Sequence, residues 1–453
     1  MISRRDFFRI AGLGAGMALA SGAVPTFFRR RRALAAPTGD ATLSAGAIFI
    51  VLNGGARTQC VFNGAVGLGT NPFGQLTGLP VPLSALMSGT GLDDPEINGR
   101  VNLLTTCQHH NRTGNHGTGR VVACTGYEPQ EDKPGVLSLI NYSFSFRDIP
   151  CVNIGNDTPT TNIGSEISST FAPIKISSPL NVQDIVAALE STQVSPEEAS
   201  RLDELRYGLE DQFLRGTKYT APADIPFFQR KAAEIAGQLS NDALDLRTNA
   251  AMGNDVDGAP VNNSDLRASF GVNANGGGNA MGAKAMLALR LRQLGCAGIT
   301  LSSDQNWDLH SNEENGLPPR AAGVGQAIAG LIRNLSRIPD TRSPGRTLLD
   351  TTVITVLTDF NRGNWGVGTG FNGNQGSDHR TGEDKTAMQC IPIIGGGLPG
   401  GKVLGEVTGD GSPAGSSPVY ETRQVLATVL DLLGIPSEGF LPGISPVTAE
   451  LLA

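Results

Sequence analysis

The sequence predicts an α/β fold with a mostly parallel central sheet and helices on both of its faces. Short apolar runs alternate with longer helical patterns, and each run is followed by glycine or polar residues rather than by a hairpin turn. The hydrophobic fraction of 39% is enough for a sizeable core. The expected strands span residues 47–53, 101–107, 150–155, 297–302, 352–358 and 391–394.

Helical patterns fill the segments between these runs. Ser195-Pro196-Glu197-Glu198 is a capping box with proline at the first helical position, which predicts a helix to about residue 214. Further helices are expected over residues 227–246, 280–294, 320–336 and 422–433. Residues 253–279 are rich in glycine, asparagine and aspartate, which predicts a long surface excursion. No segment reads as a linker, so residues 36–453 are expected to form a single domain.

The N-terminus has the features of a twin-arginine signal peptide. Ser3-Arg4-Arg5-Asp6-Phe7-Phe8 precedes a mildly apolar run, four arginines and Ala33-Leu34-Ala35, which predicts cleavage before Ala36. We therefore expect residues 1–35 to direct the folded protein through the twin-arginine translocase to the periplasm or cell surface. An N-terminal anchor that is never cleaved is the alternative. The run is too short and too weakly apolar to favour a permanent membrane span.

Charge and cysteine spacing exclude several classes of protein. Removal of residues 1–35 would take away seven arginines and one aspartate, so the net charge would fall from −7 to −13. No basic cluster remains to bind a phosphate backbone, and nucleic acid is therefore not an expected partner. The six cysteines are irregularly spaced, which disfavours a zinc knuckle and predicts few or no disulfides. No dinucleotide fingerprint, iron–sulfur spacing or haem attachment motif supports a redox cofactor.

The histidines and nearby carboxylates predict a metal or anion site. All five histidines fall in two places, one after the second expected strand and one after the fourth and fifth. Because the carboxyl ends of parallel strands share one edge of a sheet, we expect the late residues to meet there. Carboxylates mixed with imidazole suit a divalent cation such as zinc, manganese, calcium or magnesium. The alternative is a polar cluster that only caps strand ends. The candidate ligands are Asp308, His310, Asp359, Asp378 and His379.

The early histidines differ in what they predict. His109 and His110 are expected to be ordinary loop residues. His116 lies among glycines at positions 114, 117 and 119. Because glycine has no side chain, the His116 imidazole is expected to be accessible. Arg120 follows four residues later and could bind an anion as a bidentate fork.

Several motifs resemble an exported bacterial family catalogued as domain of unknown function fifteen-oh-one, which is related to the alkaline phosphatase and sulfatase superfamily. The similarity covers nearly all of the chain after residue 35 and is strongest from Leu294 onward. The motifs that carry it are Asn306-Trp307-Asp308-Leu309-His310-Ser311-Asn312, Val356-Leu357-Thr358-Asp359-Phe360-Asn361-Arg362, Gly376-Ser377-Asp378-His379, Gly395-Gly396-Gly397, Leu52-Asn53-Gly54-Gly55 and Asn115-His116-Gly117. The resemblance implies an alkaline-phosphatase-like fold and places the candidate ligands in its metal-binding region.

The chain also departs from working hydrolases of that superfamily. Asn53 and Gly54 stand where those enzymes have paired aspartates, and His116 stands at the nucleophile's position. The predicted catalytic residues are therefore His116 as nucleophile or base, Thr118 as an attacking hydroxyl, and Arg120. Two hypotheses follow: a metal-dependent hydrolase of an anionic small-molecule ester, phosphate or sulfate, and a non-catalytic exported binding or assembly protein on the same fold.

Overall fold

The computed structural model describes residues 45–66, 71–109, 114–144, 151–165, 167, 172–180, 182, 241–310, 312–360, 362, 379, 388–409 and 411–453. Four of the sequence predictions lie outside these residues: the signal peptide at 1–35, the helix at 195–214, His110 and Asp378.

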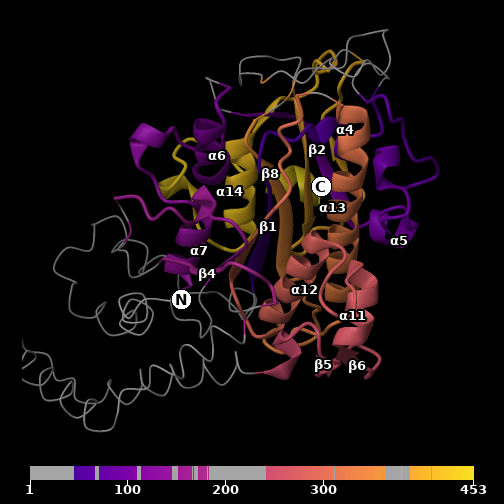
Figure 1. Ribbon diagram of the computed structural model, residues 1–453. Helices are drawn as coiled ribbons and strands as arrows, with labels where there is room; N and C mark the ends of the chain where they lie inside the picture. The colour runs from indigo at the N-terminus through magenta and orange to yellow at the C-terminus, as the bar shows by residue number, and fades with distance from the viewer. Residues whose placement is uncertain are drawn as a thin grey trace, which may run out of the picture.

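A nine-stranded sheet forms the centre of the molecule (Figure 1). Along the sheet the order is β10-β2-β9-β8-β1-β7-β3-β4, and β11 also pairs with β2. All six predicted strands are present, which confirms the fold class. The strands are β1 (Gly46–Leu52), β2 (Val101–Gln108), β3 (Val152–Ile154), β4 (Ile174–Ile176), β7 (Gly298–Ser302), β8 (Thr352–Thr358), β9 (Gln389–Gly395), β10 (Val403–Leu404) and β11 (Tyr420–Glu421).

Strand direction makes the sheet mostly parallel. Strand β9 runs antiparallel to both of its neighbours, β2 and β8, and every other pairing in this sheet is parallel. Strands β1, β2, β7 and β8 therefore point the same way, and their carboxyl ends lie at one edge.

Helices cover both faces because β1 is apolar on both. Its residues Ile48, Ile50 and Leu52 belong to one core, whereas Ala47, Phe49 and Val51 belong to another. The first core is completed by α4 (Thr58–Phe62), α11 (Asn263–Phe270), α12 (Ala280–Gln293) and α13 (Glu313–Leu335). The second is completed by α6 (His116–Thr125), α7 (Val136–Ser143) and α14 (Thr422–Leu432), which lie on the opposite side of the sheet in Figure 1.

The predicted surface excursion at residues 253–279 is only partly right: most of it is exposed, but it is a regular structure rather than a loop. This segment contains most of a hairpin, β5 (Ala251–Asn254) and β6 (Pro260–Asn262), and then α11, which packs against α12 and α13. Its polar residues form the turn and the helix cap: Asp255 Oδ1 accepts backbone N–H groups of the hairpin turn, and the Asn262 side chain accepts the Asp265 N–H at the start of α11.

Two helix boundaries also differ from the prediction. The helix expected at 320–336 already begins at Glu313 and includes Pro318 and Pro319 in its first turns. Of the helix expected at 227–246, the structure describes only residues 241–246, where the short 3-10 helix η6 (Asp242–Leu244) is found. All six cysteine side chains are buried, in agreement with their expected role as small buried hydrophobes. In the described part of the chain, no helix has the length and apolarity that crossing a bilayer requires.

Candidate metal centre

The candidate site lies at the carboxyl edge of the sheet, where segments far apart in the sequence meet. Leu52 at the end of β1 is the register partner of Thr358 at the end of β8, so the Asn53–Gly55 turn lies beside Asp359. The Gly54 N–H donates a hydrogen bond of 2.9 Å to Asp359 Oδ2. Strand β7 is followed by the segment that carries Asp308, and β2 leads to α6.

His116 is the first residue of α6. The Asn115 side chain caps this helix by accepting the N–H groups of Gly117 and Thr118, so the helix begins at a defined position. His116 Nδ1 lies 2.9 Å from Asp359 Oδ2, and its Nε2 lies 3.2 Å from Asp308 Oδ2. The ring therefore bridges two carboxylates, one fully buried and one partly exposed.

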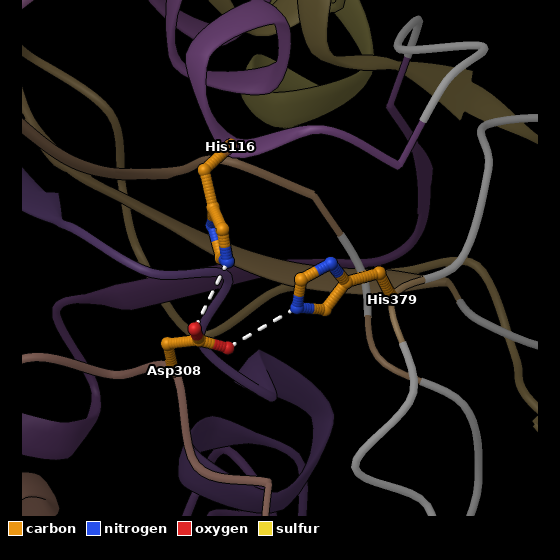
Figure 2. A group of neighbouring side chains, drawn as sticks. All are labelled: His116, Asp308 and His379. Carbon is orange, nitrogen blue, oxygen red and sulfur yellow. Dashed lines mark hydrogen bonds and ion pairs between the residues drawn. The ribbon is translucent and has the colours of Figure 1, made fainter.

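His379 contacts the other oxygen of the Asp308 carboxylate. Its Nε2 lies 3.1 Å from Asp308 Oδ1, and its Nδ1 lies 3.0 Å from the carbonyl oxygen of Gly114. Figure 2 shows the Asp308 carboxylate facing both imidazole rings, whose centroids lie 4.4 Å apart. One ligand atom from each of His116, Asp308 and His379 lies within 4.8 Å of the others, which makes them the group in the described chain able to hold a metal ion.

Proton positions in this group follow from the acceptors around it. Burial lowers the pKa of His379, so the ring is neutral at pH 7 and carries one proton. Both partners of this ring can only accept: the Gly114 carbonyl at Nδ1 and the Asp308 carboxylate at Nε2. Burial raises the pKa of Asp308, but hydrogen bonds from Arg362 and His379 and the Arg362 charge outweigh it and lower the pKa to about 2. A neutral ring has one proton for these two acceptors, so one ring nitrogen directs its lone pair at an acceptor; with the proton on Nδ1, that acceptor is the ionised Asp308 carboxylate.

Aromatic and basic side chains surround the group. The Phe360 ring lies against both imidazoles, with centroid distances of 4.7 Å to His116 and 4.6 Å to His379. The side chain of His310 is 57% exposed, and its Nε2 lies 2.8 Å from Asp308 Oδ1. The guanidinium of Arg362, which is fully buried, forms an ion pair with the same carboxylate oxygen.

Glycine is required in the turn after β1. Gly54 has φ +110°, and a Cβ there would lie 2.5 Å from the backbone nitrogen of Asp308 and from Asn306 Oδ1. A Cβ on Gly55 would lie 2.4 Å from the Phe360 ring. The turn can therefore approach the Asp308 segment only because both residues lack a side chain.

Most of the predicted ligands converge. Asp308, His310 and His379 are in direct contact, and Asp359 joins them through His116, whose predicted role was nucleophile or base. The remaining predicted ligand, Asp378, lies outside the described residues.

The other predicted catalytic residues lie on α6. Arg120 Nε is 3.6 Å from Asp359 Oδ2, and the Arg120 side chain is 38% exposed. Thr118 is half-buried in the first turn of the helix, where its N–H is held by Asn115. His109, an expected loop residue, directly follows β2, but it is buried, 6.4 Å from Phe360 between ring centroids.

Sequence reasoning did not assign a role to Arg362 or Phe360. Both stand in the same motif as Asp359, at the end of β8, and this proximity was the available signal. In the sequence, an arginine beside a candidate metal ligand argues against a role in cation binding, because its charge would repel the cation. Only the structure shows that Arg362 is the buried partner of Asp308.

Comparison with known proteins identifies the family. A family profile described as "Protein of unknown function (DUF1501)" matches residues 87–445. Among curated proteins, none matches the sequence. The crystal structure of the lipoteichoic acid synthase LtaP from Listeria monocytogenes is similar over 90% of this chain and 75% of that chain, with 9% identity and a TM-score of 0.36, too low to carry a functional argument. The match over residues 87–445 confirms the resemblance found in the motifs, and the chain belongs to the DUF1501 family.

Proposed function

We propose that this protein is an exported, metal-dependent hydrolase of a phosphate or sulfate ester, with one divalent cation held by His116, Asp308 and His379. The observation that carries the proposal is the convergence of hydrogen-bond acceptors. With its proton on Nδ1, the neutral His379 ring would direct the Nε2 lone pair at ionised Asp308, and His116 Nε2 is buried with no hydrogen-bond partner among the described residues. Acceptors that face each other repel, and a cation between them would remove this cost.

The surroundings of both imidazoles support a metal ligand role. The Nδ1 atoms of His116 and His379 lie within hydrogen-bond distance of the Asp359 carboxylate and the Gly114 carbonyl. Partners of this kind typically orient metal-ligating histidines and fix their tautomer. Two imidazoles and one carboxylate favour zinc or manganese, since calcium and magnesium prefer oxygen ligands throughout.

Three protein ligands would leave a coordination position for water or substrate, as in catalytic zinc sites. A bound ion would polarise an ester oxygen and favour ionisation of a water molecule. Arg120 would bind the anionic part of the ester, since it lies 3.6 Å from Asp359 at the same edge of the sheet and its side chain is 38% exposed. Asp359 would hold the ring of His116 in position and balance the added positive charge.

The second candidate is a non-catalytic binding or assembly protein, and one observation favours it. Asp308 already forms an ion pair with Arg362, and His116 lies between two carboxylates. If His116 carried a proton on each ring nitrogen, it would donate to both carboxylates, and this part of the network would be satisfied without an ion.

Metal analysis separates the two candidates. Protein purified from the periplasm should contain about one zinc or manganese ion per chain and hydrolyse an aryl phosphate or an aryl sulfate. His379→Ala should lose both the metal and the turnover. Wild-type protein that contains no divalent metal and has no activity on either ester would refute the hydrolase and support the binding protein.

Export is the other part of the proposal. Arg4 and Arg5 support recognition by the twin-arginine translocase, which accepts folded cargo and would deliver a protein with its core already formed. Replacement of both arginines by lysine should leave the protein in the cytoplasm with its signal peptide attached. Unchanged amounts of cleaved protein in the periplasmic fraction would contradict this route.

A further inference from the structure

We propose that Arg362 is a positioning residue of this centre: its guanidinium fixes the Asp308 carboxylate in the orientation that faces both imidazoles. The inference rests on the proposed metal site and adds a residue that is not itself a ligand. Arg362 is fully buried and cannot contact a substrate, so its effect has to act through its neighbours.

The guanidinium connects two of the segments that form the centre. Arg362 Nε donates to the Gly55 carbonyl at 2.7 Å, and Nη2 donates to the Gly54 carbonyl at 2.9 Å. Nη2 also pairs with Asp308 Oδ1, and Nη1 donates to the Leu309 carbonyl at 3.3 Å. The turn after β1 and the Asp308 segment are therefore held by one planar group.

The same residue is linked to the third ligand segment through the backbone. Arg362 and His379 form an antiparallel bridge, which places their main chains side by side. His379 Nε2 then meets Asp308 Oδ1, the oxygen that Arg362 holds. One arginine thus sets the relative positions of an aspartate ligand and a histidine ligand that are 71 residues apart in the sequence.

Asp308 depends on this contact for its orientation. Its backbone N–H is bonded to the Asn306 side chain, whereas the partners of its carboxylate in the described structure are Arg362 and the imidazoles of His116, His310 and His379. An imidazole that binds a metal through Nε2 can no longer donate from that atom. Once metal is bound, Arg362 would therefore be the buried partner that still directs the carboxylate, beside the mostly exposed His310.

Two effects of Arg362 on metal affinity have opposite signs. Its positive charge repels a cation and weakens metal binding. Its planar guanidinium, however, already holds Asp308 in the binding orientation, so less entropy is lost when the metal binds and the affinity rises. The geometry favours the second effect, because the guanidinium donates to three carbonyl oxygens as well as to the carboxylate and is held in place by them. Lysine retains the charge but cannot reproduce this planar set of donors. Arg362→Lys therefore removes the positioning effect and keeps the charge effect.

The test measures zinc and manganese affinity of full-length mature protein by competition with a chromophoric chelator, together with thermal unfolding of the metal-free form. Positioning predicts that Arg362→Lys and Arg362→Met each lose about 10-fold to 100-fold in affinity. Arg290 is the matched control, since it is fully buried and saturated by Asn263, Gln293 and the Val261 carbonyl near the β5–β6 hairpin. Arg290→Met should lower the melting temperature and leave metal affinity unchanged.

The outcomes are distinguishable. Wild-type protein that binds no metal overturns the proposed function itself. Wild-type binding combined with an Arg362→Lys affinity within about threefold of wild type overturns only the positioning role. Tighter binding by Arg362→Met would show that charge repulsion dominates, which also overturns it. If the Arg362 variants do not fold, Asp308→Glu is the second test: it moves the carboxylate by one methylene against the fixed fork and should cost a similar factor, whereas wild-type affinity would contradict the proposal.

Discussion

Replacement of Asp359 by asparagine tests how the strand β8 carboxylate supports the centre. The Asp359 side chain is fully buried, and its Oδ2 lies 2.9 Å from both the Gly54 nitrogen and His116 Nδ1. Asparagine has the same shape, so the change removes the charge and leaves packing nearly intact. Its new amide group would occupy one oxygen position, and Asp359 Oδ1 has no hydrogen-bond partner in the described structure to receive a donor.

The size of the effect follows from these two contacts. Hydrogen bonds to a charged group contribute about 1.5–3 kcal/mol, compared with about 0.5–1.5 kcal/mol for neutral ones, so two weakened bonds should lower the free energy of unfolding by about 2–3 kcal/mol. Loss of the carboxylate behind a metal-ligating histidine typically costs about 10-fold to 100-fold in metal affinity. At about 1.4 kcal/mol per tenfold, the binding free energy should weaken by about 1.4–2.8 kcal/mol.

Urea unfolding of the metal-free protein and chelator competition measure these two quantities separately. Asp340→Asn provides the control, because Asp340 is also buried and accepts hydrogen bonds from Thr351 Oγ at 2.7 Å and Arg342 Nε at 2.9 Å. Asp340 lies near the amino end of β8, at the opposite edge of the sheet. Both variants should be less stable, but only Asp359→Asn should bind metal more weakly. Wild-type metal affinity in a destabilised Asp359→Asn protein would refute the reasoning.

The remaining predictions concern ligand choice, pH and backbone geometry. His379→Ala should abolish stoichiometric metal, whereas His310→Ala should cost under about tenfold because that side chain is mostly exposed; equal losses in a metal titration would contradict this ranking. Burial alone would raise the pKa of Asp340, but hydrogen bonds from Thr351 and Arg342 and the Arg342 charge lower it overall. The ionised Asp340 therefore stabilises the fold fully above about pH 4, and this contribution is lost as the pH falls through the lowered pKa. The free energy of unfolding, measured in urea between pH 6 and pH 2, should therefore fall more with decreasing pH in wild type than in Asp340→Asn. Parallel pH dependences of the two proteins would contradict this. Gly54→Ala should lower both stability and metal affinity, since its Cβ would lie 2.5 Å from the backbone nitrogen of Asp308. Gly74→Ala, with φ +83° and open space around its Cβ, should lower stability alone. Equal losses of zinc affinity in the two variants, measured by calorimetric titration, would contradict the importance of the close approach.

The sheet and its functional edge could be predicted because the relevant signals are local. Alternating apolar runs and helical patterns mark the strands, and parallel strands bring their carboxyl ends together. This reasoning placed Asp308 and His379 at one edge, and the structure has them in contact. The direction of β9 could not be predicted, since a short apolar run has the same composition in either direction.

Other features required knowledge of long-range contacts. Glycine, asparagine and aspartate at residues 253–279 suit a loop, but the same residues form a hairpin turn and the cap of α11, and the apolar face of that helix is short. His116 could be singled out by its glycine neighbours, yet its position between Asp308 and Asp359 depends on contacts across about 190 and 240 residues. The role of Arg362 depends on the carbonyl oxygens of a turn that precedes it by about 300 residues.

Anomalous diffraction from crystals grown with zinc or manganese tests the central claim most directly, since it locates the ion and its ligands together. The account predicts one peak at about 2.0–2.2 Å from His116 Nε2, an oxygen of Asp308 and His379 Nε2. Crystals in which Asp308 still faces both imidazoles, with no anomalous peak at that position, would contradict it.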